Sequence, residues 1–111
     1  MHLPARADGG PHQPIATGAV WSPSWTVAQP AATLWYHPHA HGATEDHVAR
    51  GVAGMIIVDD ARADRLALPR EYGVDDVPVI LQDVRLRDDG ALDLGKRLVS
   101  PTGRLGDTIL V

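Results

Sequence analysis

Three histidines stand at alternate positions in the segment LWYHPHAHG: His37, His39 and His41. The chain of 111 residues contains six histidines and no cysteine. Neutral imidazole binds copper, zinc, iron and nickel, so the segment predicts a metal site. The lack of cysteine excludes disulfides, thiolate nucleophiles, Cys-ligated zinc or iron–sulfur sites, and a blue-copper centre, which requires a thiolate.

The spacing of these histidines favours two of the three as ligands. If Leu34 to His39 is extended, side chains alternate between two faces, and Trp35, His37 and His39 share one face. Residues i and i+2 of a strand lie about 6–7 Å apart at their Cα atoms. Their imidazoles can therefore converge on one ion or each bind one ion of a close pair. His41 precedes a glycine and is expected in a turn; the alternative for the whole segment is a surface turn with solvated imidazoles.

Two other H-x-H sites fail on spacing. A metallo-β-lactamase-like site needs an acid two residues after the second histidine, where His41 stands. A cupin needs a glutamate four or five residues after that histidine, whereas Glu45 is six residues on. A cupin also needs a glycine six residues before the first histidine, where the chain has Ala31.

The elements that would position this segment are mostly short strands. Residues 1–18 are rich in Gly and Pro and are expected to be a loop. One short helix is predicted from Thr44 to Gly51, with Thr44 as its cap and Gly51 just past its end. One helical turn is predicted around Ala63 to Leu66.

Five segments carry the apolar or β-branched pattern of strands. Turn residues separate them, which is typical of a β-sandwich or barrel. A turn at RDDG is expected to fold ALDL back as a hairpin. The predicted strands are Val20–Val27 with an edge or bulge at Pro23, Ala32–Tyr36, Met55–Val58, Val77–Leu86 and the final TILV.

Charge and hydropathy exclude two classes of partner. The formal net charge is −4 and no run of Lys or Arg occurs, so nucleic acid is not an expected partner. No apolar stretch approaches the roughly 18 residues that a membrane span requires. We therefore expect neither nucleic acid nor membrane as a partner.

Four segments in order carry a resemblance to a known family: DGGPHQPI, QPAATLWYHPHAHG, HVARGVAGMIIVDD and VPVILQDVRL. Together they resemble the N-terminal cupredoxin domain of a three-domain multicopper oxidase of the bacterial laccase, cuprous oxidase or bilirubin oxidase kind. The resemblance implies an all-β, cupredoxin-like (plastocyanin-like) Greek-key β-sandwich, incomplete at its N-terminus. Residues 1–95 would form this partial domain, and residues 96–111 a linker and the start of a second cupredoxin domain.

The resemblance also implies a site. The family motif W-[YF]-H-x-H matches Trp35 to His39, which makes His37 and His39 type 3 copper ligands, one for each copper of the pair. Asp8 in ADGG matches a family acid that hydrogen-bonds near the type 2 copper's water and helps deliver protons. From the residues alone, a cap of the turn at Gly9 and Gly10 is the favoured role of Asp8, and the two roles do not exclude each other. Four histidines are not expected ligands: His2, His12, His41 and His47.

The activity implied is oxidation of a reducing substrate coupled to reduction of dioxygen to water at a trinuclear copper cluster. The first family motif, H-W-H-G, would lie just before Met1, and the last two motifs belong to a C-terminal domain. This chain alone is therefore predicted to be inactive and to need the remaining cupredoxin domains. Because members of this family are usually exported, the resemblance implies a periplasmic or secreted protein. The alternative is a stand-alone cupredoxin-like module that binds a metal ion or a partner without turnover.

Overall fold

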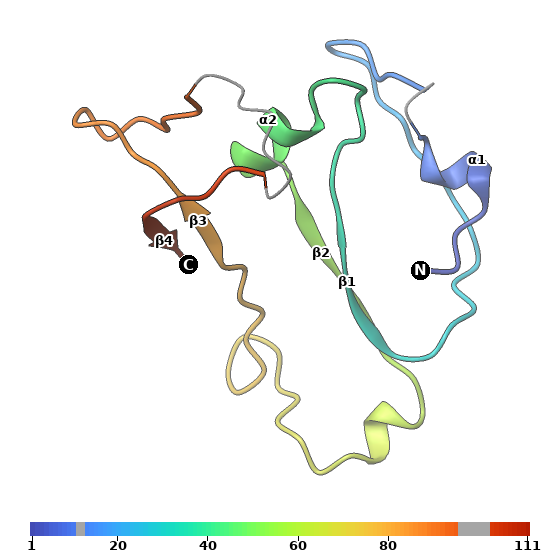
Figure 1. The fold of residues 1–111 in the computed structure, drawn as a ribbon. Coiled ribbons are helices and arrows are strands. Elements are labelled where there is room, and N and C mark those ends of the chain that lie inside the picture. The colour runs from blue at the N-terminus through green and yellow to red at the C-terminus, as the bar shows by residue number, and fades with distance from the viewer. Residues whose placement is uncertain (11–12, 96–102) are drawn as a thin grey trace. The chain divides into compact units, whose positions relative to one another are not determined.

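The computed structural model describes residues 1–10, 13–95 and 103–111 (Figure 1). The chain divides into two compact units, Met1–Arg65 and Leu66–Val111, which are described separately. The first unit holds α1 (Ala5–Asp8), β1 (Ala32–Tyr36), α2 (Thr44–Ala49), β2 (Gly54–Val58) and the 3₁₀ turn η1 (Ala63–Arg65). The second unit holds β3 (Gln82–Val84) and β4 (Thr108–Leu110).

In the first unit, β1 and β2 pair antiparallel. Ala32 lies opposite Val58 at one end of the ladder, and Tyr36 lies opposite Gly54 at the other. β1 covers the predicted residues, and β2 adds Gly54 to its predicted range. The prediction of a buried β2 is wrong, because its side chains are half-buried or exposed.

The helix α2 connects the two strands, and its C-terminal end follows the prediction. Gly51 has φ +79°, a conformation that costs glycine little. The Gly51 N–H donates to the Val48 carbonyl (2.9 Å), and the Val52 N–H donates to the His47 carbonyl (3.0 Å). This is a Schellman motif, which satisfies the last carbonyls of the helix and turns the chain into β2.

The N-terminal end of α2 differs from the prediction. Thr44 is the first helical residue rather than the cap. Its Oγ1 donates to the Ala40 carbonyl (3.0 Å), so the hydroxyl closes the preceding turn and leaves the helix without a side-chain cap.

In the second unit, β3 and β4 pair antiparallel, with Val84 opposite Thr108. The predicted final strand is confirmed as β4, and the predicted hairpin after RDDG is confirmed by a bridge between Leu86 and Leu92. The strand predicted over Val77–Leu86 is mostly wrong, because only Gln82–Val84 forms a ladder. Pro78 has no N–H to donate, so it interrupts any ladder through its position.

Two further predictions near the N-terminus are wrong. The expected loop over residues 1–18 contains α1, whose first turn is closed by the Ala7 N–H donating to the Pro4 carbonyl (2.8 Å). Val20–Val27 forms no strand in the described structure. Pro23 lacks the N–H that pairing would use, and Val20 is 87% exposed.

The apolar core is small. Among the described residues, only Ala7 and Val84 are buried apolar side chains, each 5% exposed. Trp35 and Tyr36 in β1 remain 60% and 58% exposed. Burial within this chain therefore supplies little of the apolar free energy that stabilises a domain. No helix in the described parts is long and apolar enough to cross a bilayer.

Candidate metal centre

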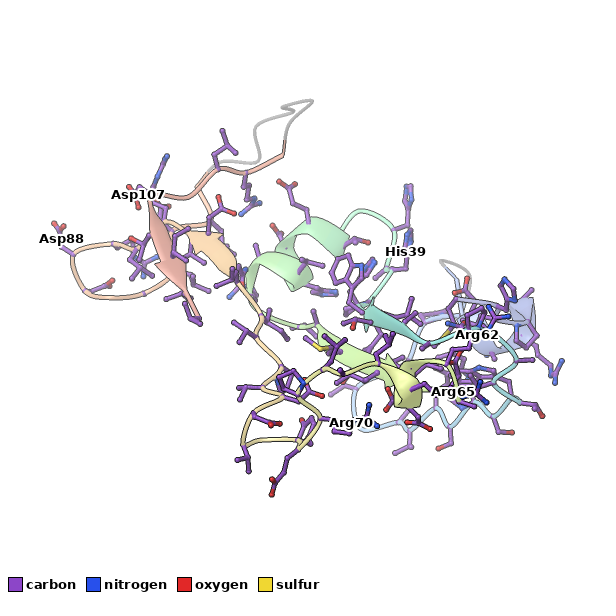
Figure 2. All side chains as sticks on the ribbon, turned by 90° about the horizontal axis from the view of Figure 1, so that it is seen from below. His39, Arg62, Arg65, Arg70, Asp88 and Asp107 are labelled. Carbon is purple, nitrogen blue, oxygen red and sulfur yellow. The ribbon has the colours of Figure 1, made fainter. Side chains whose placement is uncertain are left out.

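The histidine segment begins where the β1–β2 ladder ends. Tyr36, opposite Gly54, is the last paired residue of β1, and His37, Pro38 and His39 follow it directly. Pro38 has no N–H, so the ladder cannot continue through it. Figure 2 shows His39 on the connection between β1 and α2. The strand thus fixes where the segment starts, and the proline ends the pairing there.

Three rings follow one another at this end of β1. The Trp35 and His37 rings are stacked, with centroids 4.3 Å apart and planes at 26°. The His37 and His39 rings are tilted by 38°, with centroids 5.7 Å apart. The alternation predicted from the sequence therefore brings the two candidate imidazoles together beside the tryptophan.

A hydrogen bond selects one nitrogen of His37. Its Nδ1 lies 3.0 Å from the Pro38 carbonyl oxygen. A carbonyl oxygen only accepts, so Nδ1 carries the proton in this bond and Nε2 keeps its lone pair. Metal-binding histidines commonly donate their other ring N–H to a carbonyl or carboxylate in this way. His37 is therefore set up to bind a metal through Nε2.

The two imidazoles suit copper by donor type, and their separation fits one shared ion or two ions about 4 Å apart. They are not a complete cage. Within the described residues, no group of three or more His, Asp or Glu side chains is placed to hold a metal ion. The residues present fit a partial copper site with two ligands.

The other histidines lie apart from this pair. His41 is exposed in the turn before α2. His47 lies within α2, where its Nδ1 is buried without a hydrogen-bond partner among the described residues. His2 contacts the Ala28 carbonyl through Nδ1 (3.3 Å). His12 falls outside the described residues.

Asp8 forms no metal-holding group with His37 and His39 in the described structure. It is the last residue of α1 and its side chain is exposed. No described residue donates a hydrogen bond to its carboxylate, so the predicted cap of the glycine turn does not form. The turn depends instead on Gly9, with φ +79°, where an added Cβ would lie 3.0 Å from the Trp21 ring.

Asp60 supports the hairpin, and the sequence reasoning missed it. Its carboxylate accepts hydrogen bonds from the N–H groups of Ala31 (3.0 Å), Ala63 (2.9 Å) and Arg62 (2.8 Å). These bonds, the one from Ala31 first, hold the pKa of Asp60 below its ordinary value. The bonds from Arg62 and Ala63 could have been predicted from the sequence, because an acid just before a helical turn commonly accepts from the first N–H groups of that turn. No sequence pattern signals the bond to Ala31, which joins the end of β2 to the start of β1.

Comparison with known proteins identifies the family. The sequence pattern described as "Multicopper oxidase" matches residues 1–63, more than half of the chain. The chain belongs to the multicopper oxidase family. Two solved structures, a laccase and a laccase-like multicopper oxidase, are similar to this chain at 42% and 45% identity.

The laccase from Pediococcus acidilactici aligns with a TM-score of 0.81 and 42% identity, over 94% of this chain and 22% of the laccase. The laccase-like multicopper oxidase CueO from Ochrobactrum sp. aligns with a TM-score of 0.70 and 45% identity, over 76% of this chain and 19% of CueO. These similarities confirm the all-β, cupredoxin-like fold class predicted from the sequence.

Curated relatives carry a different kind of name. "Cell division protein FtsP" from Xenorhabdus nematophila is 45% identical over 109 residues, 98% of this chain and 23% of the relative. The protein of the same name from Escherichia coli K12 is 40% identical over 111 residues, 100% of this chain and again 23% of the relative. The chain therefore spans about a quarter of the length of the curated relatives it matches.

Proposed function

We propose that this chain supplies two type 3 copper ligands, His37 and His39, to a multicopper oxidase. The whole protein would couple oxidation of a reducing substrate to reduction of dioxygen to water. The observation that carries the proposal is the pair of imidazoles, 5.7 Å apart, at the position of the family motif W-[YF]-H-x-H. Bound copper would supply one-electron redox chemistry.

The residues of this chain would have separate tasks. His37 binds through Nε2, because its Nδ1 is held by the Pro38 carbonyl. His39 presents a second imidazole whose ring lies tilted to the first. Asp8, an exposed carboxylate, would take protons from water and pass them toward the site of oxygen reduction.

The remaining ligands would come from other parts of the parent protein. We assign residues 1–95 to a partial N-terminal cupredoxin domain, and residues 96–111 to a linker and the start of the next one. Dioxygen, a reducing substrate and the other cupredoxin domains are the partners on this proposal. The protein would work in the periplasm or after secretion.

The test uses the full-length protein that carries this chain. His37→Ala and His39→Ala should each lower the bound copper and abolish oxygen uptake with a phenolic reductant, because each removes one copper ligand. His41→Ala is the matched control, since His41 belongs to the same segment but lies outside the ring contacts. This variant should keep the bound copper and the oxygen uptake of the parent protein. Full copper content in His37→Ala/His39→Ala would overturn the assignment.

The proton role of Asp8 needs its own measurement. Asp8→Asn keeps the size of the side chain but removes the ionisable group, so the rate of oxygen reduction should fall about a hundredfold, in the range for acid–base groups. Copper content should stay unchanged, because Asp8 is not one of the proposed copper ligands. An unchanged rate would remove Asp8 from the proposal.

The names of the curated relatives favour a second candidate, a cupredoxin-like module that binds a partner in cell division without turnover. Cells that lack the parent gene would be complemented with the His37→Ala/His39→Ala variant. Normal division in these cells, with oxygen uptake absent, would favour the module. Failure of the copper-free variant to complement would favour the oxidase.

A further inference from the structure

We propose that Trp35 is a positioning residue that fixes the plane of the His37 ring for copper binding. This inference rests on the proposed function and adds the means by which one of its two ligands is held. The observation behind it is the stack of the two rings, with centroids 4.3 Å apart and planes at 26°.

The hydrogen bond to Pro38 does not fix the His37 ring by itself. The ring torsion of histidine is broad, so several ring orientations have similar energy. The Nδ1 contact at 3.0 Å holds one atom of the ring and selects the tautomer. The stack holds the plane. Together the two contacts determine where the Nε2 lone pair points.

His39 is held much less. Its side chain is exposed, and its described ring contact is the tilted one with His37. No described residue forms a hydrogen bond with its imidazole. The two ligands therefore differ: His37 is oriented before the metal arrives, and His39 adjusts to it. A preoriented ligand loses less conformational freedom on binding.

The neighbouring aromatic residue provides a matched comparison. Tyr36 is 58% exposed and Trp35 is 60% exposed, and both belong to β1. Tyr36 lies across the ladder from Gly54, and a Cβ added to Gly54 would meet the tyrosine ring. Tyr36 therefore packs on the hairpin, whereas Trp35 packs on the metal ligand.

The experiment compares three variants of the full-length protein. Trp35→Leu keeps an apolar side chain but removes the stack, and Trp35→Phe keeps an aromatic ring. Tyr36→Leu is the control and removes the aromatic ring at the neighbouring position. Copper affinity is measured by competition with a chelator of known affinity. Trp35→Leu should bind copper about tenfold more weakly, as expected for loss of a contact that orients a ligand. Trp35→Phe should retain most of the affinity, and Tyr36→Leu should match the parent protein.

A second readout needs no copper. In the copper-free protein with ¹⁵N-labelled histidine, His37 should show one tautomer, protonated at Nδ1. Trp35→Leu should show a mixture, because a ring that can rotate about its torsion no longer keeps Nδ1 at the Pro38 carbonyl. The His37 signal is assigned by its loss in His37→Ala. A mixture in Tyr36→Leu as well, or equal losses of copper affinity in Trp35→Leu and Tyr36→Leu, would overturn the positioning role.

The two readouts separate this inference from the proposed function. A parent protein that binds no copper but shows the tautomer change in Trp35→Leu would overturn the copper assignment and leave the stacking role standing. Copper bound at His37 and His39 with unchanged affinity in Trp35→Leu would overturn the positioning role alone.

Discussion

The two strand pairs of this chain are held in different ways. The β1–β2 pair spans five residues of each strand and is tied at its open end by Asp60, which reaches Ala31 at the start of β1. The β3–β4 pair spans three residues of each strand and depends on a close approach of Gly106 to Val84. Each pair has one side-chain hydrogen bond across it, from the Ala31 N–H to Asp60 in the first and from the Gly106 N–H to Asp83 (2.6 Å) in the second. Only the second pair also brings a glycine against the backbone of the opposite strand. We therefore expect the second pair to tolerate substitution less well than the first. The first pair carries the candidate site.

The largest effect is expected at Gly106. A Cβ there would lie on the backbone atoms of Val84, which cannot move without breaking the β3–β4 pairing. Gly106→Ala should therefore cost about 3 kcal/mol of the free energy of unfolding. Denaturant unfolding of the full-length protein measures this cost, with the exposed neighbour Leu105→Ala as control. Equal stability of the two variants would show that the approach is not tight.

A smaller effect is expected at Gly54 in the first pair. A Cβ there would meet the outer end of the Tyr36 ring, which is exposed and can swing away. Gly54→Ala should therefore cost about 1 kcal/mol. The double variant Gly54→Ala/Tyr36→Ala should not show this cost relative to Tyr36→Ala, because the ring is gone. A cost that persists without the ring would place the obstruction elsewhere.

The smallest effect concerns pH. The pKa of Asp60 is lowered in the folded chain by the N–H groups of Ala31, Ala63 and Arg62. Its contribution to stability is therefore present above the unfolded pKa, near 3.8, and is lost as the pH falls through the folded value. Asp60→Asn should flatten the decline of stability below about pH 4. An unchanged slope in Asp60→Asn would contradict the prediction.

The sequence was most informative where local chemistry decides the structure. β1 has its predicted bounds, and Gly51 ends α2 as predicted, because alternation and a glycine after a helix act within a few residues. The sequence was least informative where the pairing of strands decides the structure. Val77 to Leu81 have a strand pattern, yet no described strand pairs with them. A strand needs a partner, and one sequence pattern does not specify it.

The candidate site divides in the same way. The contact between His37 and His39 follows from strand alternation and was predicted. The bond from His37 to the Pro38 carbonyl depends on a side-chain torsion, and the bond from Ala31 to Asp60 joins distant parts of the chain. Neither hydrogen bond could be predicted from the spacing of residues in the sequence. The role of Asp8 came from the family resemblance alone and stays a prediction.

The small sheets of the described residues have a consequence for handling the isolated chain. With two strands in each sheet, every strand is an edge that offers unpaired backbone N–H and C=O groups. β2, with the sequence GMIIV, has neither a charge nor a proline to discourage pairing with another copy. Expressed by itself, this chain is therefore expected to aggregate, and a solubilising fusion would be needed before its copper binding could be measured in isolation.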